Sequence, residues 1–177
     1  MSNLVYIATS LDGYIARRDD SIDWLDVPNP TQSDYGFAAF MAGVDAVLIG
    51  RRTFDVVLTF KAWPYTKPVF VLSRTLSTLQ AHVEGRVTLL GGAPADVTAR
   101  LRAQGFSRLY VDGGNVIQGF LREDLIDEMT ITRVPIVLGA GIPLFGEGVE
   151  IPFRHAETVV FDNLLVRSKY IRDERRP

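Results

Sequence analysis

Two consecutive arginines follow a buried apolar run in the segment Gly50-Arg51-Arg52-Thr53. The preceding run Ala46–Ile49 has the length and composition of a buried strand, and the residues after it are expected to open a helix. A helix N-terminus leaves backbone N–H donors unpaired, and guanidinium groups add planar donors that suit phosphate. The segment therefore predicts a phosphate site; the alternative is a plain strand-to-helix turn with two solvated arginines.

A second strand-to-helix turn carries paired glycines, in Asp112-Gly113-Gly114-Asn115 after the apolar run Leu109–Val111. Glycine permits positive φ and lets the backbone approach a ligand closely, so that N–H groups can surround a pyrophosphate. The spacing fits neither the G-x-G-x-x-G fingerprint of Rossmann folds nor a Walker A loop. Taken alone, the pair is better explained as a structural tight turn.

A third polar segment, Ser73-Arg74, ends the apolar run Val69–Leu72. In a parallel sheet, ligands bind outside the carboxyl ends of the strands. Three such strand ends that present glycine, hydroxyl or guanidinium groups are together much stronger evidence for a phosphate-binding site than any one of them. Two arginine clusters also indicate a ligand with more than one phosphate group.

Short apolar runs bounded by Gly, Pro or Asp predict buried strands. They lie at Leu4–Ala8, Ala46–Ile49, Val69–Leu72, Val87–Leu90, Leu109–Val111, Met129–Val134, Thr158–Phe161 and Leu164–Ile171. Helices are expected at Tyr35–Ala42, Arg51–Thr59, Pro94–Gln104 and Val116–Arg122. The alternation predicts an α/β fold with a mostly parallel sheet. The last two runs flank Asp162-Asn163 with no room for a helix, so they predict a C-terminal antiparallel hairpin and a mixed sheet.

Two long segments lack periodicity, Asp12–Ser33 and Pro135–Pro152. Long loops in compact domains are usually functional. We therefore expect both segments to border the site.

Composition excludes several classes of protein. The 177 residues suit a single domain spanning 1–177, and a net charge of −2 gives no basic excess for nucleic acid. The chain has no cysteine, so it can form neither a disulfide nor a thiolate metal site. His82 and His155 lie far apart and are expected to be solvated or edge-strand residues, so no metal site is predicted. The sequence shows no signal peptide and no apolar run of membrane-spanning length, which predicts a cytoplasmic protein with no membrane contact.

Four segments together resemble a known family: Ile7–Ala16, Ile49–Thr53, Asp112–Gly114 and Thr132–Phe145. The last is similar to the P-x-V-L-G-x-G-x-P-L-F signature of riboflavin-type reductases. Over nearly its whole length the chain resembles the dihydrofolate reductase fold family. The closer match is to the reductase domain of the bifunctional riboflavin-biosynthesis deaminase-reductase and its small stand-alone relatives. The resemblance implies a three-layer fold with helices on both faces of the sheet.

The resemblance also implies NADPH as the cofactor. Arg51, Arg52 and Thr53, after Gly50, are expected to meet phosphates, and Leu72, Ser73 and Arg74 to lie near the adenosine 2′-phosphate. Gly113, Gly114, Asn115 and Val116 are expected to hold the pyrophosphate, while Ala8 and Ile15 flank the nicotinamide carboxamide.

Asp34 is the candidate for the reacting end. It lies 16 residues before Gly50, a spacing similar to that of the substrate-binding carboxylate in dihydrofolate reductases. A carboxylate there can pair with the amidine-like N–H edge of a pterin or aminopyrimidine. The alternative, which we favour, is that Asp34 or Ser33 is only the N-cap of the following helix.

Three further residues are expected near the substrate on the same resemblance. Thr132 matches a threonine that backs the carboxylate, although a buried core threonine is an equal alternative. Trp24 is expected on a mobile loop near the substrate, or else as an apolar staple that fastens this loop. Ala38 is expected to contact the substrate from the helix that follows Asp34.

Two departures concern the substrate. Dihydrofolate reductases carry an arginine just before the strand at Val69, where this chain has Lys67-Pro68, and lysine lacks the bidentate fork. No extra basic cluster plainly serves a ribosyl phosphate. Without cysteine, and with only His82 and His155 far apart, these 177 residues are not expected to contain the zinc deaminase domain with which the riboflavin-type domain commonly occurs.

The leading hypothesis is therefore an NADPH-dependent reductase acting on a pterin-like or aminopyrimidine-like heterocycle, a small-molecule substrate. The alternatives are a nucleotide-binding module of the same fold without efficient turnover, and an interaction protein that reuses the fold. A homodimer is also expected, because riboflavin-type domains commonly pair and the apolar stretch Ile142–Phe145 can serve an interface.

Overall fold

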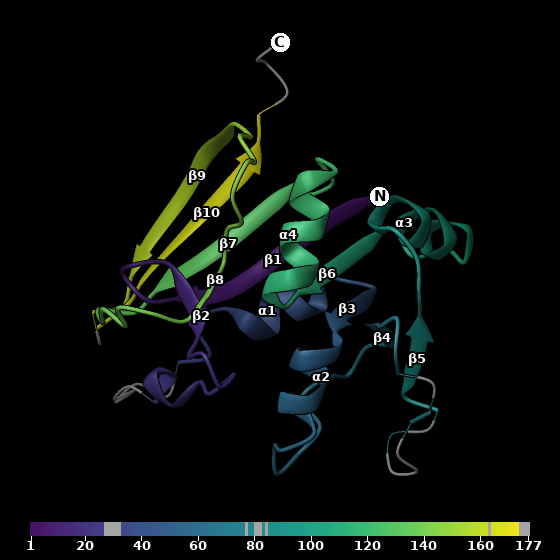
Figure 1. Cartoon of the computed structure of the whole chain (residues 1–177). Coiled ribbons are helices and arrows are strands. Elements are labelled where there is room, and N and C mark those ends of the chain that lie inside the picture. Colours follow the sequence, from purple (N-terminus) through teal and green to yellow (C-terminus); the bar gives the residue numbers. More distant parts are fainter. Residues whose placement is uncertain (27–32, 77, 80–82, 84, 163, 174–177) are drawn as a thin grey trace.

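The computed structural model of the 177-residue chain describes residues 1–26, 33–76, 78–79, 83, 85–162 and 164–173. Its elements follow in the order β1 (Ser2–Thr9), β2 (Tyr14–Ala16), the 3-10 helix η1 (Asp23–Leu25), α1 (Phe37–Ala42), β3 (Ala46–Gly50), α2 (Arg51–Val57), β4 (Val69–Leu72), β5 (Val87–Leu90), α3 (Pro94–Ala103), β6 (Arg108–Asp112), α4 (Gly114–Arg122), β7 (Glu128–Arg133), β8 (Ile142–Pro143), β9 (Phe153–Val160) and β10 (Val166–Arg172). Figure 1 shows their arrangement.

One eight-stranded sheet organises these elements, in the order β5-β4-β3-β6-β1-β7-β10-β9. The pairs from β5 to β7 are parallel, whereas β10 runs antiparallel to both β7 and β9. The prediction of a mixed, mostly parallel sheet with a C-terminal antiparallel hairpin is therefore confirmed. Because β3, β6 and β1 are neighbours in the sheet, their carboxyl ends meet at one edge.

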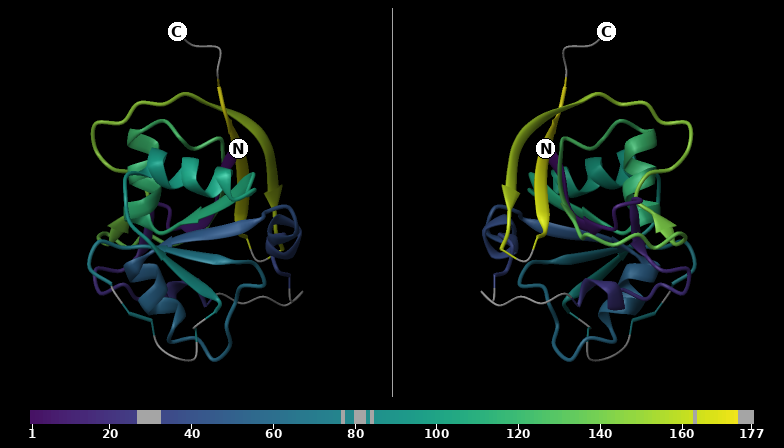
Figure 2. Two further views of the ribbon diagram at one scale, coloured as in Figure 1. Left: turned by 90° about the vertical axis from the view of Figure 1, so that its right-hand side faces the viewer. Right: turned by 90° about the vertical axis from the view of Figure 1, so that its left-hand side faces the viewer.

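Two hydrophobic clusters lie on opposite faces of the sheet and give three layers. On one face, α3 and α4 pack through fully buried side chains such as Leu101, Ile117 and Phe120. On the other face, α1 and α2 contribute Met41 and Phe54. Figure 2 shows α2 and α4 on opposite sides of the sheet. The predicted three-layer arrangement is confirmed.

Burial along the strands follows from these layers. Ala46–Ile49 of β3 are completely buried, because both faces of a central parallel strand are covered. In contrast, β9 lies at the sheet edge and most of its residues are exposed, among them His155. His82 lies outside the described residues. No described helix has both the length and the apolar character that a membrane crossing demands.

The structure corrects several element boundaries. α1 begins at Phe37 instead of Tyr35, because Tyr35 and Gly36 have φ values of 57° and 90°, which are not helical. α2 ends at Val57, two residues earlier than predicted, and α4 begins at Gly114, two residues earlier than predicted. The last hairpin begins at Phe153, well before Thr158, since the alternating polar residues of this edge strand hid its start.

The two long irregular segments are joined to each other. Each contributes one short strand that sequence reasoning missed, and these strands, β2 and β8, pair in antiparallel fashion. Asp12 links the segments as well: its carboxylate accepts hydrogen bonds from Ser10 Oγ at 2.6 Å, Leu138 N at 3.1 Å and Gly139 N at 2.7 Å. The Asp12 carboxylate thus fixes the turn after β1 against the glycine-rich loop.

The apolar stretch Ile142–Phe145 is less exposed than its sequence suggested. Leu144 is completely buried in the core, and Ile142 is partly buried. Phe145 remains half exposed. The stretch is therefore no continuous apolar surface, and the homodimer stays a prediction.

Asp12→Asn should loosen the contact between the two irregular segments. The hydrogen bonds to the ionised form lower the pKa of Asp12, with the Ser10 hydroxyl as the largest cause. Its stabilising contribution is thus present above the ordinary aspartate pKa and lost as the pH falls through the lowered value. We expect faster hydrogen exchange at the amides of 136–139 in the variant at pH 7, measured by mass spectrometry. Unchanged exchange there would contradict the role given to Asp12.

Candidate functional site

A cleft of about 820 Å³ opens at the carboxyl edge of the sheet. Every residue predicted to contact the cofactor lines it: Ala8, Ile15, Gly50, Arg51, Arg52, Thr53, Leu72, Ser73, Arg74, Gly113, Gly114, Asn115 and Val116. These residues come from β1, β2, β4 and the turns β3–α2 and β6–α4. The three motifs that are separated in sequence therefore border one cavity.

The two strand-to-helix turns touch one another at glycines. Gly113 has φ of 93°, and a Cβ atom there would lie 2.3 Å from Thr53 Oγ1. A Cβ atom on Gly50 would lie 3.0 Å from Val116 Cγ2. A side chain at Gly113 would overlap the neighbouring turn, so this glycine is required both by its backbone angle and by the close approach.

The phosphate end of the cleft, defined by Arg51, Arg52, Arg74 and Arg122, is rich in cations. The Arg51 Nε atom lies 2.8 Å from the Asp55 carboxylate, which holds the side chain along α2. Arg52 is two-thirds exposed, and its carboxylate partner in the described structure, Asp20, is 3.8 Å away. Sequence reasoning missed Arg122, because it lies two turns beyond the glycine motif on α4 and carried no local signal.

The backbone around these arginines is suited to an anion. α4 begins directly at Gly114, so the N–H groups of its first turn have no carbonyl partner within the helix. A Cβ atom on Gly114 would lie 3.0 Å from Ile15 Cδ1 and 3.3 Å from Ile142 Cγ2, so the turn is packed against β2 and β8. Ser73 Oγ accepts hydrogen bonds from the amides of Thr75 and Leu76, which fixes the turn after β4. The donor set fits a phosphorylated dinucleotide such as NADPH.

The aromatic end of the cleft is defined by Tyr6, Phe60, Tyr65 and Tyr110. Tyr110 is buried and donates from its hydroxyl to the Tyr6 carbonyl oxygen at 2.9 Å. Aromatic faces of this kind can stack on a planar heterocycle. The cleft is therefore lined by aromatic side chains as well as by arginines.

Asp112 is the carboxylate that the cleft places beside the tyrosines, and sequence reasoning assigned it no role beyond the turn. It ends β6 and lines the cleft, and its Oδ1 accepts a hydrogen bond from Gly113 N at 2.8 Å. Burial raises the pKa of Asp112 to about 6, against the lowering effect of that hydrogen bond. Burial, together with the charge of Asp112, also raises the pKa of Tyr65 and of Tyr110. A signal existed: an aspartate two residues after a buried Tyr110 must share its face of the strand.

Asp34 has a different environment from the one expected of a substrate anchor. Its Oδ1 accepts from Gly36 N at 2.9 Å and its Oδ2 from Ala38 N at 2.8 Å, and both bonds lower its pKa. The side chain is exposed and lies outside the residues that line the cleft. The N-cap of α1 is Gly36 and not Asp34 or Ser33, although Asp34 still accepts a hydrogen bond from the first turn of the helix. The substrate role of Asp34 stays a prediction.

The other predicted substrate residues also lie away from the cleft lining. Thr132 is buried on β7, and its register partner is Ala8 of β1, which does line the cleft. Trp24 is buried against Val134 and Leu165, as expected of an apolar staple. Ala38 is exposed on α1. The structure therefore brings together the predicted cofactor residues but not the predicted substrate residues.

Fold and cleft together define a class of protein: an α/β domain with a dihydrofolate reductase-like sheet and a cleft lined by both cationic and aromatic side chains. The model of the RibD C-terminal domain matches residues 4–166, and the chain belongs to this family. The structure of a candidate riboflavin biosynthesis protein from Shewanella sp. PV-4 is 50% identical and covers 98% of this chain and 100% of its own, with a TM-score of 0.94.

Two more distant structures share the fold. The diaminohydroxyphosphoribosylaminopyrimidine deaminase/5-amino-6-(5-phosphoribosylamino)uracil reductase of Thermotoga maritima is 14% identical, with a TM-score of 0.73 over 97% of this chain and 56% of that chain. Dihydrofolate reductase from Enterococcus faecalis, complexed with NADP(H) and RAB-propyl, is 14% identical, with a TM-score of 0.66 over 98% of this chain and 97% of that chain. The chain thus has the fold of these reductases.

Gly113→Ala should destabilise the site through its contact with Thr53. We expect a loss on the order of 1–3 kcal/mol in the free energy of unfolding, measured by chemical denaturation. Gly105→Ala is the control, since Gly105 has φ of 92° and nothing lies within 4 Å of a Cβ atom there. The second substitution in Thr53→Ala/Gly113→Ala should restore part of the loss. Equal effects of G113A and G105A would show that the contact between the turns contributes nothing.

Proposed function

We propose that the protein is an NADPH-dependent reductase that transfers a hydride to a pterin-like or aminopyrimidine-like heterocycle. The observation that carries the proposal is the shared cleft: three motifs selected for phosphate binding line one cavity, whose other end is aromatic. The dihydrofolate reductase of the same fold is complexed with NADP(H), which supports the choice of cofactor.

The phosphate end would hold the cofactor. Arg51, Arg52 and Thr53 are suited to the phosphates, while the first turn of α4 offers backbone donors to the pyrophosphate. Ser73 and Arg74 are suited to the 2′-phosphate. When bound, NADPH would supply the hydride, and the chain's own residues orient the ring and exclude water.

The aromatic end would hold the heterocycle. Tyr6, Tyr65 and Phe60 offer faces for a planar ring, and Asp112 offers a carboxylate to its N–H edge. Asp112 serves this purpose better than Asp34, because both oxygens of Asp34 accept backbone hydrogen bonds. The Thermotoga maritima protein of the same fold is named for the reduction of an aminouracil, a ring with such N–H groups.

Arg74→Met should weaken NADPH binding and leave NADH binding almost unchanged. A guanidinium on the 2′-phosphate is worth about 1.5–3 kcal/mol, so the dissociation constant for NADPH should rise at least tenfold. Fluorescence titration measures both constants. Arg154→Met removes one exposed arginine of β9 outside the cleft and is the matched control. Equal losses for the two cofactors would remove Arg74 from the 2′-phosphate site.

Asp112→Asn should abolish a pH dependence centred near the pKa of Asp112, which is about 6. In the wild type we expect kcat/KM for the heterocycle to fall as the pH drops through this value, because the neutral acid no longer accepts two N–H bonds. The variant should show a lower and flat profile.

Stability gives a separate check on the same residue. The unfolded carboxyl has a pKa of about 3.9, below the native value. The native state therefore binds more protons between these values, and its stability falls as the pH rises through this window. The stability of D112N relative to the wild type should therefore be greater at pH 7 than at pH 4, as measured by thermal unfolding.

The kinetic experiment has its own contrary outcome. If D112N keeps the wild-type dependence of kcat/KM on pH, Asp112 takes no part in the reaction.

Oxidation of bound NADPH tests the function itself. Dihydrofolate and a ribosylaminopyrimidine are offered in turn, and loss of absorbance at the NADPH band is followed. Oxidation with either supports a reductase and selects the substrate class. Tight NADPH binding without oxidation by any heterocycle would instead favour a nucleotide-binding module of the same fold.

A further inference from the structure

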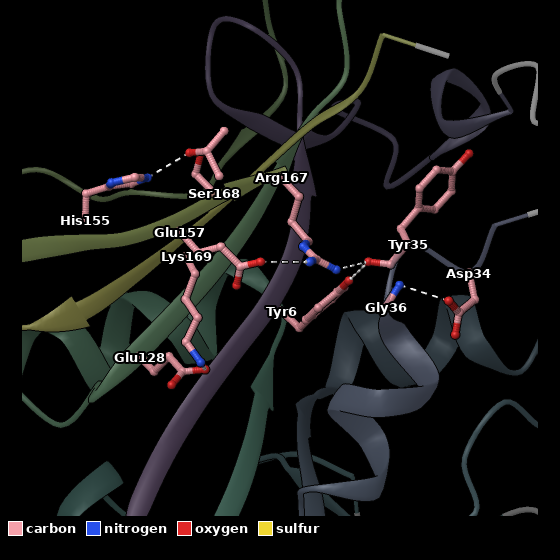
Figure 3. A network of polar contacts seen from close by, with 11 residues as sticks. Tyr6, Asp34, Tyr35, Gly36, Glu128, His155, Glu157, Arg167, Ser168 and Lys169 are labelled. Atoms are coloured by element: carbon pink, nitrogen blue, oxygen red, sulfur yellow. Dashed lines mark hydrogen bonds and ion pairs between the residues drawn. The ribbon is translucent and has the colours of Figure 1, made fainter. Parts of the chain in front are cut away.

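The backbone carbonyl of Tyr35 accepts two hydrogen bonds at the start of α1. The Tyr6 hydroxyl donates to it at 2.5 Å, and the guanidinium of Arg167 donates to it from β10. Figure 3 shows both donors converging on this oxygen. The Tyr6 hydroxyl is protonated at neutral pH, and burial raises its pKa further above the ordinary tyrosine value.

The carbonyl belongs to an unusual stretch of backbone. Tyr35 has φ of 57° and Gly36 has φ of 90°, so two successive residues are left-handed. For a tyrosine this conformation is strained and persists only where its surroundings impose it. A Cβ atom on Gly36 would lie 2.2 Å from Arg167 Nη1, so the turn closes directly onto the guanidinium.

The guanidinium of Arg167 is largely withdrawn from water, which is energetically unfavourable for a residue with a purely structural role. Its side chain is only 19% exposed, and Glu157, the carboxylate with which it pairs, is 3.8 Å from Nη2. The guanidinium carbon also lies 5.6 Å from the centre of the Phe161 ring. Among the described residues the ion pair with Glu157 is this long one, and withdrawing a charge from water into such a loose pair contributes little net stability.

The effect of Arg167 can reach the cleft through Tyr6. Tyr6 lines the aromatic end, and its ring packs against Phe40 of α1 with centroids 4.8 Å apart. Phe40 in turn packs against Tyr110, a second cleft residue, with centroids 5.0 Å apart. Arg167 itself is the register partner of Thr132 on the sheet. A shift of α1 would thus move Tyr6 and Tyr110, which we call the aromatic wall of the cleft. The arginines that line the cleft lie on other elements and would not be moved directly.

We propose that Arg167 is a positioning residue for the reduction: through the Tyr35 carbonyl and the Tyr6 hydroxyl it fixes α1 and the aromatic wall against which the heterocycle binds. The proposal rests on the proposed function for the identity of the ligand. It also gives the C-terminal hairpin a part in substrate binding, although no residue of β9 or β10 lines the cleft.

Three variants test the inference. Arg167→Met removes the donor and the charge, Arg167→Lys keeps the charge, and Tyr6→Phe keeps the ring but removes the second donor. Arg172→Met is the control, because Arg172 lies on the same strand and pairs with Asp124 at 2.5 Å, away from the cleft. For each variant we would measure the KM and kcat for the heterocycle, the NADPH dissociation constant, and amide exchange across Phe37–Ala42.

R167M should raise the KM for the heterocycle by up to roughly tenfold, because one charge-assisted hydrogen bond that positions α1 is lost. The NADPH dissociation constant should stay within about twofold of the wild type. R167K should restore part of the loss. Y6F should act in the same direction, and the double variant should fall short of the product of the two effects because both donors share one acceptor. Exchange across α1 should quicken in R167M and not in R172M.

The outcomes separate this inference from the proposed function. Quicker exchange in α1 with no heterocycle reduced would support the positioning of α1 by Arg167 and reject the reductase. Reduction by R167M with wild-type KM, or equal losses of heterocycle and NADPH binding, would overturn the positioning role. Unchanged exchange in α1 would overturn it as well.

Discussion

The contact between two strand-to-helix turns is the constraint on which the cleft depends. Gly113 lies so close to Thr53 that no side chain fits between them, and Gly50 meets Val116 in a similar way. Because these contacts bring the start of α2 beside the start of α4, the arginines of one turn and the backbone donors of the other line the same cleft. A cationic site results from two elements that are each unremarkable in sequence.

The carboxyl edge of the sheet also receives contributions from outside the parallel strands. Asp12 holds the turn after β1 to the glycine-rich loop, and β2 and β8 pair beside it, so Ile15 and Ile142 pack on Gly114. The irregular segments thus form a fixed rim around the central β1. This explains why the two long segments, separated by more than a hundred residues, behave as one border of the cleft.

Sequence reasoning succeeded where local chemistry decides structure. Strand ends, glycine turns and arginine pairs are encoded within a few residues, and the three motifs found from them all line the cleft. The cofactor roles that the family resemblance implies for these residues stay predictions. Sequence reasoning succeeded less where contacts between segments distant in sequence place a residue. Asp34 is placed by a left-handed turn that the sequence did not reveal. The strand period puts Asp112 on the same face as Tyr110, but its burial in the cleft depends on elements distant in sequence. The role proposed for Arg167 depends on the pairing of β10 with β7, and no sequence motif predicts that pairing.

The central position of β1 has a consequence for how the chain folds. Leu4 pairs with Tyr110 on one side and with Glu128 on the other, so the middle of the sheet joins residues more than a hundred positions apart. Parallel pairings of such sequence separation close large loops before they gain stabilising contacts, and this slows folding. Until β6 and β7 are available, β1 presents an apolar strand with two unpaired edges. The folding chain therefore passes through a period in which β1, a central strand of the finished sheet, is exposed to aggregation.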